Sequence, residues 1–203
     1  MKNYLSTIWW WYKRKVEPGF GLAKGSKVLD VGSGDKPFWR ADVLVDKLDL
    51  GDDQRATFGG IKTNGKKIVD ADAANLPFDD ESFDFVYCSH LLEHVADPIK
   101  VVEEILRVTK KDGGGYLEVP NLMNEATMPH PTHRWIIGEG KNGELVFYRK
   151  SKKLHELLFD NGRRNASKTG RMWTNGENVF IKKYWRKAEG LKIVVVDEIN
   201  DGY

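Results

Sequence analysis

Apolar and polar residues follow two different periods along this chain. Short apolar runs, each ending at an acid, a glycine or another small residue, are typical of buried β-strands. The expected strands cover 27–31, 43–46, 67–70, 83–88 and 116–119. Between the last two, 98–108 repeats apolar residues at helical spacing, and the glycines 113–115 are expected to break that helix. Strands alternating with helices and tight turns predict an α/β fold with a mostly parallel sheet.

The two ends of the chain carry further patterns. Apolar and aromatic residues at helical spacing predict an amphipathic, tryptophan-rich helix within 1–20, either covering the sheet or pocket or lying on a membrane surface. Near the other end, 151–160 is expected to be helical, and 178–183 and 192–198 to be strands. No linker or repeat divides the chain, so we predict one domain over 1–203.

The composition of the chain disfavours several classes of protein. The 203 residues include one cysteine, Cys88, so no intramolecular disulfide can form. No apolar run reaches the roughly 20 residues that span a bilayer, and these features predict a cytoplasmic protein. With 32 Lys and Arg against 30 Asp and Glu, the net charge of +2 gives no strong nucleic-acid signal. The oligomeric state is left open.

A glycine turn follows the first predicted strand. The segment 28–34 reads Val-Leu-Asp-Val-Gly-Ser-Gly, and in a parallel sheet such a turn lies at the edge where ligands bind. Asp46 ends the second strand, where a carboxylate can accept both hydroxyls of a ribose. Asp70 and Asp72 end the third strand. Lys36 and Pro37 stand where a dinucleotide fingerprint needs its third glycine, which argues against a nicotinamide dehydrogenase.

Four motifs then follow one another in a distinctive order and spacing. They are Asp-Val-Gly-Ser-Gly at 30–34, Leu-Pro-Phe at 76–78, Ser-Phe-Asp-Phe-Val at 82–86 and Leu-Glu-His-Val at 92–95. Over 27–121 the chain resembles the class I S-adenosylmethionine-dependent methyltransferases of the type 11 group. The resemblance implies a Rossmann-like fold with a mostly parallel seven-stranded sheet flanked by helices.

The same resemblance implies S-adenosyl-L-methionine as the cofactor and 27–121 as the part that binds it. Asp46 is then expected to hold the ribose hydroxyls and Asp72 the adenine amino group. The full set of expected donor-binding residues is Asp30, Gly32, Ser33, Gly34, Asp46, Asp72, Ala73, Leu76 and Ser89.

Histidines gather in two segments, which together hold four of the 5 in the chain. If 90–94 is helical, His90, Glu93 and His94 share a face, which could bind a divalent cation or supply a general base. His133 follows the fifth strand and could approach them, so these four residues are the predicted catalytic and metal-ligating set, with Mn²⁺ or Mg²⁺ as the ion. The resemblance allows two interpretations. Many metal-free relatives carry Leu-Glu-His-Val, in which the Glu and His mainly stabilise the start of a helix. Ubiquinone-pathway O-methyltransferases and small-RNA 2′-O-methyltransferases also resemble this segment, use it for a metal, and carry an acid where His90 stands.

The acceptor is expected to be an oxygen. The Asn/Asp-Pro-Pro-Tyr/Phe signature of amino-methylating enzymes is absent, and the histidine segments and abundant tryptophan resemble methyltransferases of glycan assembly. We therefore predict transfer to a sugar hydroxyl in a glycan or sugar precursor, with His130, Arg134 and Trp135 contacting it. A small phenolic or lipid metabolite, an RNA 2′-hydroxyl and a non-catalytic donor-binding module are the alternatives.

Overall fold

A computed structural model describes residues 20–48, 60–127, 130–153, 156 and 180–196. The predicted N-terminal helix and most of the helix predicted over 151–160 lie outside this part of the chain. No helix among the described residues is long and apolar enough to cross a membrane.

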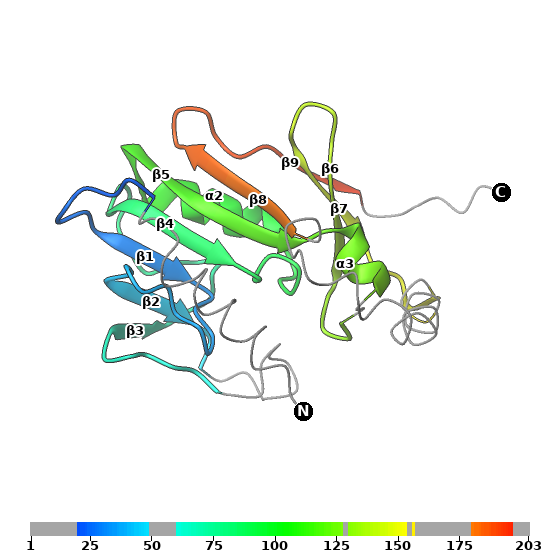
Figure 1. Ribbon diagram of the computed structural model, residues 1–203, viewed down its shortest axis with the longest axis horizontal. Helices are drawn as coiled ribbons and strands as arrows, with labels where there is room; N and C mark the ends of the chain where they lie inside the picture. Colours follow the sequence, from blue (N-terminus) through cyan, green and yellow to red (C-terminus); the bar gives the residue numbers. More distant parts are fainter. Residues whose placement is uncertain (1–19, 49–59, 128–129, 154–155, 157–179, 197–203) are drawn as a thin grey trace.

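Six strands form the main sheet (Figure 1). They are β1 (Val28–Val31), β2 (Val43–Asp46), β3 (Lys67–Asp70), β4 (Phe83–Ser89), β5 (Thr109–Pro120) and β8 (Phe180–Arg186), in the order β3-β2-β1-β4-β5-β8. All neighbours run parallel except β5 and β8, which are antiparallel. The mostly parallel Rossmann-like sheet predicted from the sequence is confirmed.

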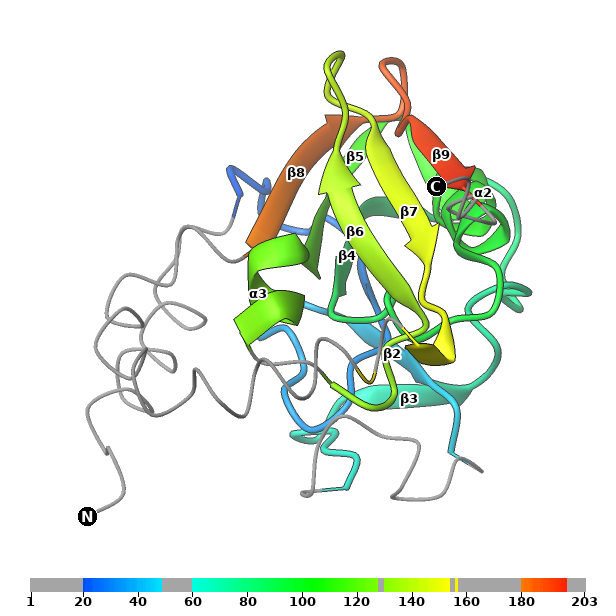
Figure 2. The same ribbon diagram turned by 90° about the vertical axis from the view of Figure 1, so that its right-hand side faces the viewer.

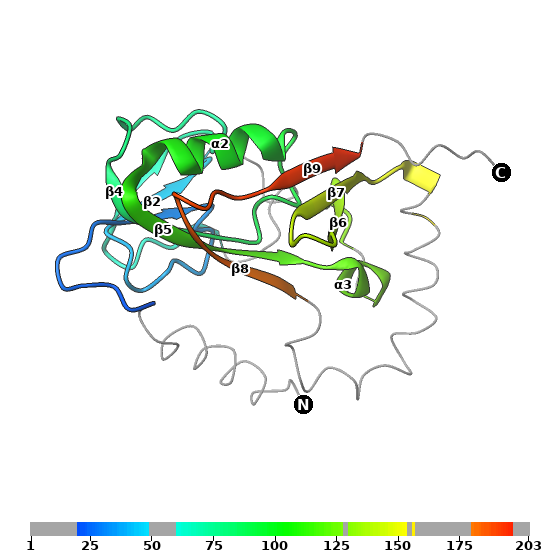
Figure 3. The ribbon, with the colours of Figure 1, turned by 90° about the horizontal axis from the view of Figure 1, so that it is seen from above.

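One helix, α2 (Pro98–Val108), lies across a face of this sheet (Figure 3). Asp97 caps it by accepting a hydrogen bond from the backbone N–H of Lys100, and a proline at the first helical position suits the helix start. Val101 and Ile105 are buried in the larger core cluster together with side chains of β1, β4 and β5. The bounds of α2 match the sequence prediction because its apolar positions and its cap are local signals.

A second, three-stranded sheet stands against the end of the first (Figure 2). It contains β6 (Trp135–Glu139), β7 (Leu145–Arg149) and β9 (Ile193–Val196) in the order β6-β7-β9, and a short helix, α3 (Leu122–Thr127), precedes it. The prediction of one seven-stranded sheet is therefore wrong for the described residues. The physical reason is that Trp135, Phe147 and Leu145 bury their apolar side chains in the same core as the main sheet, which holds β6 and β7 as a separate layer.

The glycines 113–115 do not break the chain after α2 as expected. They lie inside β5, which starts at Thr109, directly after the helix. A Cβ on Gly115 would overlap the indole of Trp185 and the backbone oxygen of Val86, so glycine is needed there for β8 and β4 to approach.

Candidate functional site

The turn after β1 is built on glycines that other residues cannot replace easily. Gly32 has a φ of +75° and donates its N–H to the carbonyl of Val45 at 2.8 Å. A Cβ at Gly32 would lie only 2.9 Å from Leu91 Cδ1. Gly34, with a φ of +53°, donates its N–H to Asp46 Oδ2 at 2.7 Å and so ties the turn to the end of β2.

Two polar side chains at this turn are buried. Asp30 accepts a hydrogen bond from the N–H of Phe38 at 2.7 Å, which holds the following loop against β1. The hydroxyl of Ser33 is buried and has no hydrogen-bond partner among the described residues. A buried hydroxyl in that state is suited to a polar group of a bound ligand.

Asp72 lies at the mouth of the site, half exposed. One carboxylate oxygen accepts the N–H of Ala74 at 2.9 Å and the other pairs with Lys47 at 3.0 Å. The Ala74 hydrogen bond is the main cause that lowers the pKa of Asp72, with Lys47 adding to it. Five other residues expected at the donor site are not among those that line the cavity described next: Asp30, Ser33, Gly34, Leu76 and Ser89, of which all but Gly34 are buried.

A cavity of about 620 Å³ joins the two groups of predicted residues. On one side it is lined by Gly32, Asp46, Asp72 and Ala73, and on the other by His94, Thr132, His133 and Arg134. Gly32, Asp46, Asp72 and His94 follow or end parallel strands at their carboxyl ends, the edge at which open parallel sheets bind ligands, whereas Thr132, His133 and Arg134 directly precede β6. A ligand held by the first group would therefore face the second.

The segment 90–94 is a turn and not the helix assumed from the sequence. His90 has a φ of +56°, and its imidazole lies between two carboxylates, with Nδ1 3.2 Å from Glu93 Oε1 and Nε2 3.2 Å from Glu118 Oε1. Burial opposes the charged ring, but the hydrogen bonds to Glu118 and Glu93 prevail and raise the pKa of His90 to about 9. Because both ring nitrogens are engaged by carboxylates, His90 does not fit the ligand role predicted for it.

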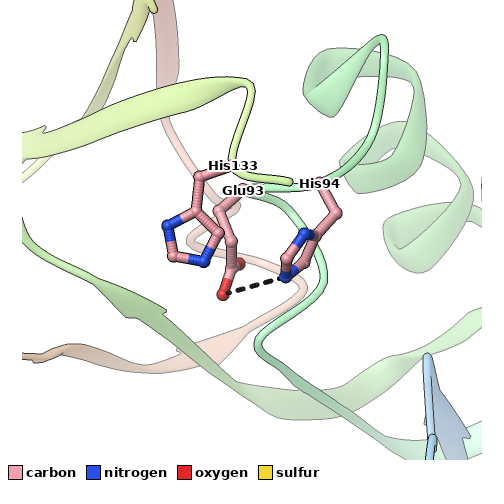
Figure 4. Close-up of side chains that lie close together, drawn as sticks. All are labelled: Glu93, His94 and His133. Atoms are coloured by element: carbon pink, nitrogen blue, oxygen red, sulfur yellow. Dashed lines mark ion pairs between the residues drawn. The ribbon is translucent and has the colours of Figure 1, made fainter. Parts of the chain in front are cut away.

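The other three predicted ligands do come together. One ligand atom from each of Glu93, His94 and His133 lies within 4.8 Å of the others, and Figure 4 shows the three side chains converging. Glu93 Oε2 and His94 Nε2 are buried without a hydrogen-bond partner among the described residues. Burial lowers the pKa of His94 to about 4, so its ring is neutral at pH 7.

Each imidazole of this cluster is oriented by a further contact. His133 Nδ1 lies 2.6 Å from Glu125 Oε2, and Glu125 forms a second ion pair with the buried ammonium of Lys150. His94 Nδ1 lies 3.0 Å from the hydroxyl of Thr132. No local pattern in the sequence pointed to Glu125 or Lys150, because the two residues come from α3 and from a position just after β7, 25 residues apart.

The three residues expected to contact the acceptor lie in different surroundings. Arg134 lines the cavity. His130 packs beside it, with its ring against those of His94 and His133. Trp135 is buried, donates its indole N–H to the carbonyl of Val95 at 2.8 Å and lies in the core, so an acceptor contact is the wrong role for it.

The cluster of Glu93, His94 and His133 fits a divalent cation. One carboxylate and two imidazoles are a common ligand set for first-row metals, and the two imidazoles line the cavity. The two buried atoms without a partner, Glu93 Oε2 and His94 Nε2, are donors of the kind that such an ion takes. The pairing of His133 with Glu125 is the carboxylate–histidine arrangement that usually supports a metal ligand.

Comparison with known proteins agrees with this geometry. Residues 29–117 match the family model described as a methyltransferase domain. A demethylmenaquinone methyltransferase of Renibacterium salmoninarum is 35% identical over 130 residues, which cover 60% of this chain and 49% of that protein. One of Paenarthrobacter aurescens is 35% identical over 111 residues, covering 50% and 42%. The chain thus spans about half the length of these curated relatives.

Solved structures give a looser likeness. A methyltransferase of Thermotoga maritima, described as a possible histamine N-methyltransferase, has a TM-score of 0.48 at 17% identity, covering 79% of this chain and 76% of that one. A methyltransferase structure from Bacillus halodurans has a TM-score of 0.40 at 23% identity, covering 70% and 64%.

Proposed function

We propose that this chain, whose residues 29–117 form a class I S-adenosyl-L-methionine-dependent methyltransferase domain, transfers the methyl group of that donor to a hydroxyl oxygen. The acceptor would lie against His94 and His133, which line the cavity. The observation that carries the proposal is the single cavity lined by the glycine turn and acids on one side and by the histidines on the other.

The proposed binding of the methyl donor is supported by residues at the ends of the strands. Asp46 lines the cavity at the end of β2 and is the residue we assign to the ribose. Gly32 lets the backbone approach the ligand without a Cβ. Asp72 and Ala73 line the part of the cavity assigned to the adenine.

The acceptor half rests on proton chemistry. Methyl transfer to an alcohol is a displacement in which the oxygen must also lose its proton, so the protein has to align two molecules and favour the deprotonated acceptor. A divalent cation such as Mn²⁺ or Mg²⁺, held by Glu93, His94 and His133, would supply Lewis-acid chemistry at that oxygen. The contact of His133 with Glu125 and that of His94 with Thr132 fix the direction in which each ring faces.

Two acceptor classes have support. A sugar hydroxyl, predicted from the sequence, suits the polar lining by Thr132, His133 and Arg134. A naphthoquinol is the second candidate, because the relatives are named demethylmenaquinone methyltransferases and because Leu91 and Val95 give the cavity an apolar side. With that acceptor the new bond would form at a ring carbon, which loses its proton, and not at a hydroxyl oxygen.

Transfer of labelled methyl to a panel of sugars, nucleotide sugars and hydroquinones tests the proposal, with and without a chelator. We expect transfer to one class, lost in Asp46→Asn with weakened donor binding and kept in Ile99→Ala, a substitution on the exposed side of α2. Loss on chelation, reversed by Mn²⁺, would support the cation. Tight donor binding without transfer to any hydroxyl would refute an O-methyltransferase and favour a donor-binding module.

A further inference from the structure

We propose that His90 is a positioning residue: it bridges Glu93 to Glu118 and so fixes the orientation of the Glu93 carboxylate beside His94 and His133 as a cation ligand. This inference rests on the cation included in the proposed function. It replaces the role of direct ligand, which the sequence suggested for His90.

The bridge has two ends. His90 Nδ1 lies 3.2 Å from Glu93 Oε1, and Nε2 lies 3.2 Å from Glu118 Oε1. Since an ionised carboxylate can only accept, both nitrogens carry hydrogen and the ring is a cation between two anions. His90 therefore has no lone pair left for a metal.

Glu118, at the far end of the bridge, is held in place by several contacts. The second oxygen of Glu118 accepts the hydroxyl of Tyr116 at 2.5 Å, and the ammonium of Lys182 lies 3.8 Å from it. Glu118 belongs to β5, whose pairing places it directly beside Ser89 of β4. The backbone N–H of His90 also donates to the carbonyl of Glu118 at 2.9 Å. The imidazole is thus fixed to the sheet by both its side chain and its backbone.

The near end of the bridge sets the orientation of Glu93. This carboxylate is fully buried, and its Oε1 takes the hydrogen bond from His90 and lies 3.9 Å from His94 Nε2, while Oε2 has no hydrogen-bond partner among the described residues. Rotation about the last side-chain bond would exchange the two oxygens. A donor fixed on Oε1 selects a single orientation of the carboxylate beside His94 and His133.

Removing His90 would affect cation affinity in two ways, and these effects have opposite signs, so a binding measurement can distinguish them. Loss of orientation would weaken cation binding, and residues that orient a ligand typically contribute about 10–100-fold in metal affinity. Loss of a positive charge beside the cluster would instead strengthen cation binding. Only the first outcome is expected if His90 acts by positioning Glu93.

The experiment measures Mn²⁺ binding by calorimetry, and the visible spectrum of bound Co²⁺, in the wild type and in His90→Asn. Asparagine tolerates the left-handed backbone at this position, where φ is +56°, so the substitution removes the bridge with little backbone strain. We expect Mn²⁺ affinity about 10–100-fold lower, a changed Co²⁺ spectrum and unaltered affinity for S-adenosyl-L-methionine. Equal or tighter Mn²⁺ binding would overturn the proposal, as would a wild type that binds neither ion.

A double variant tests the bridge itself. If His90 acts through its anchor, Glu118→Gln weakens Mn²⁺ binding in the wild type but adds nothing to His90→Asn. Independent, multiplying losses would refute the bridge. Because these measurements need no methyl acceptor, they can succeed where the methyl-transfer assay fails, and the reverse is equally possible.

Discussion

Replacing Gly32 by alanine tests how the turn after β1 is held open for a ligand. A residue with a Cβ at a φ of +75° costs about 1–2 kcal/mol in backbone conformation. The new Cβ would also lie 2.9 Å from Leu91 Cδ1 and 3.0 Å from Leu91 Cβ, well inside the optimal separation of about 3.5–4.0 Å. Such crowding typically adds about 1–3 kcal/mol. We therefore expect Gly32→Ala to lower the free energy of unfolding by about 2–5 kcal/mol.

A matched control lies two residues away. Gly34 also has a positive φ, +53°, but a Cβ there would meet nothing within 4 Å. Gly34→Ala should therefore show only the backbone cost of about 1–2 kcal/mol. Truncating Leu91 to alanine in the Gly32→Ala background should recover the part of the crowding that is due to the two Cδ atoms, while the contact with the Cβ at position 91 remains. Leu91→Ala alone completes the cycle.

Urea unfolding and calorimetric titration of S-adenosyl-L-methionine measure both consequences. Leu91 lines the cavity, so displacing it should weaken donor binding in Gly32→Ala more than in Gly34→Ala. Equal losses of stability in the two variants would refute the reasoning. So would a Leu91→Ala background in which Gly32→Ala costs as much as before.

Three further predictions concern the charges around the cluster. Glu125→Gln or Lys150→Met alone leaves a buried charge without its partner and should cost about 3–5 kcal/mol, whereas urea unfolding of the double variant should show a smaller loss than the sum. In metal-free protein, stability should peak near pH 6.5. The His94 contribution is lost as the pH falls from 6.5 through about 4, and the His90 contribution is lost as the pH rises from 6.5 through about 9. A free energy of unfolding that only rises or only falls between pH 5 and 9 would contradict this prediction. Mn²⁺ at 100 times its dissociation constant should raise the free energy of unfolding by about 2.7 kcal/mol, and a chelator should reverse the gain; an unchanged melting temperature would count against the cation.

The parts of the fold that were predicted correctly are those with local signals. Strands β1 to β4 are apolar runs that end in polar residues or glycines, and α2 has an apolar stripe and a capping aspartate. The start of β5 was missed because glycines usually interrupt strands. The reason these glycines are needed is visible only in the pairing with β4 and β8, where a Cβ would meet backbone oxygens and, at Gly115, the indole of Trp185.

The hairpin of β6 and β7 was missed although the sequence carried a signal for it. Asn142-Gly143 lies between two segments rich in apolar residues, a pairing that favours a tight turn between antiparallel strands. The register confirms the hairpin, with Glu139 opposite Leu145. The sequence did not indicate that β9 would be the third strand of this sheet, because β9 pairs with β7 from some 45 residues further along the chain. This pairing places the hairpin in a separate sheet.

Some residues of the site could be predicted from the sequence and others could not. That His94 and His133 would meet could be predicted, because each follows one of two adjacent parallel strands whose carboxyl ends share an edge. The role of His90 could not, because it depends on a backbone turn with positive φ and on Glu118, brought beside it by the pairing of β4 with β5. In a helix His90 would have faced the cavity as a ligand. In the turn it faces an anion on each side, so its charge orients Glu93 and the cluster keeps three ligands.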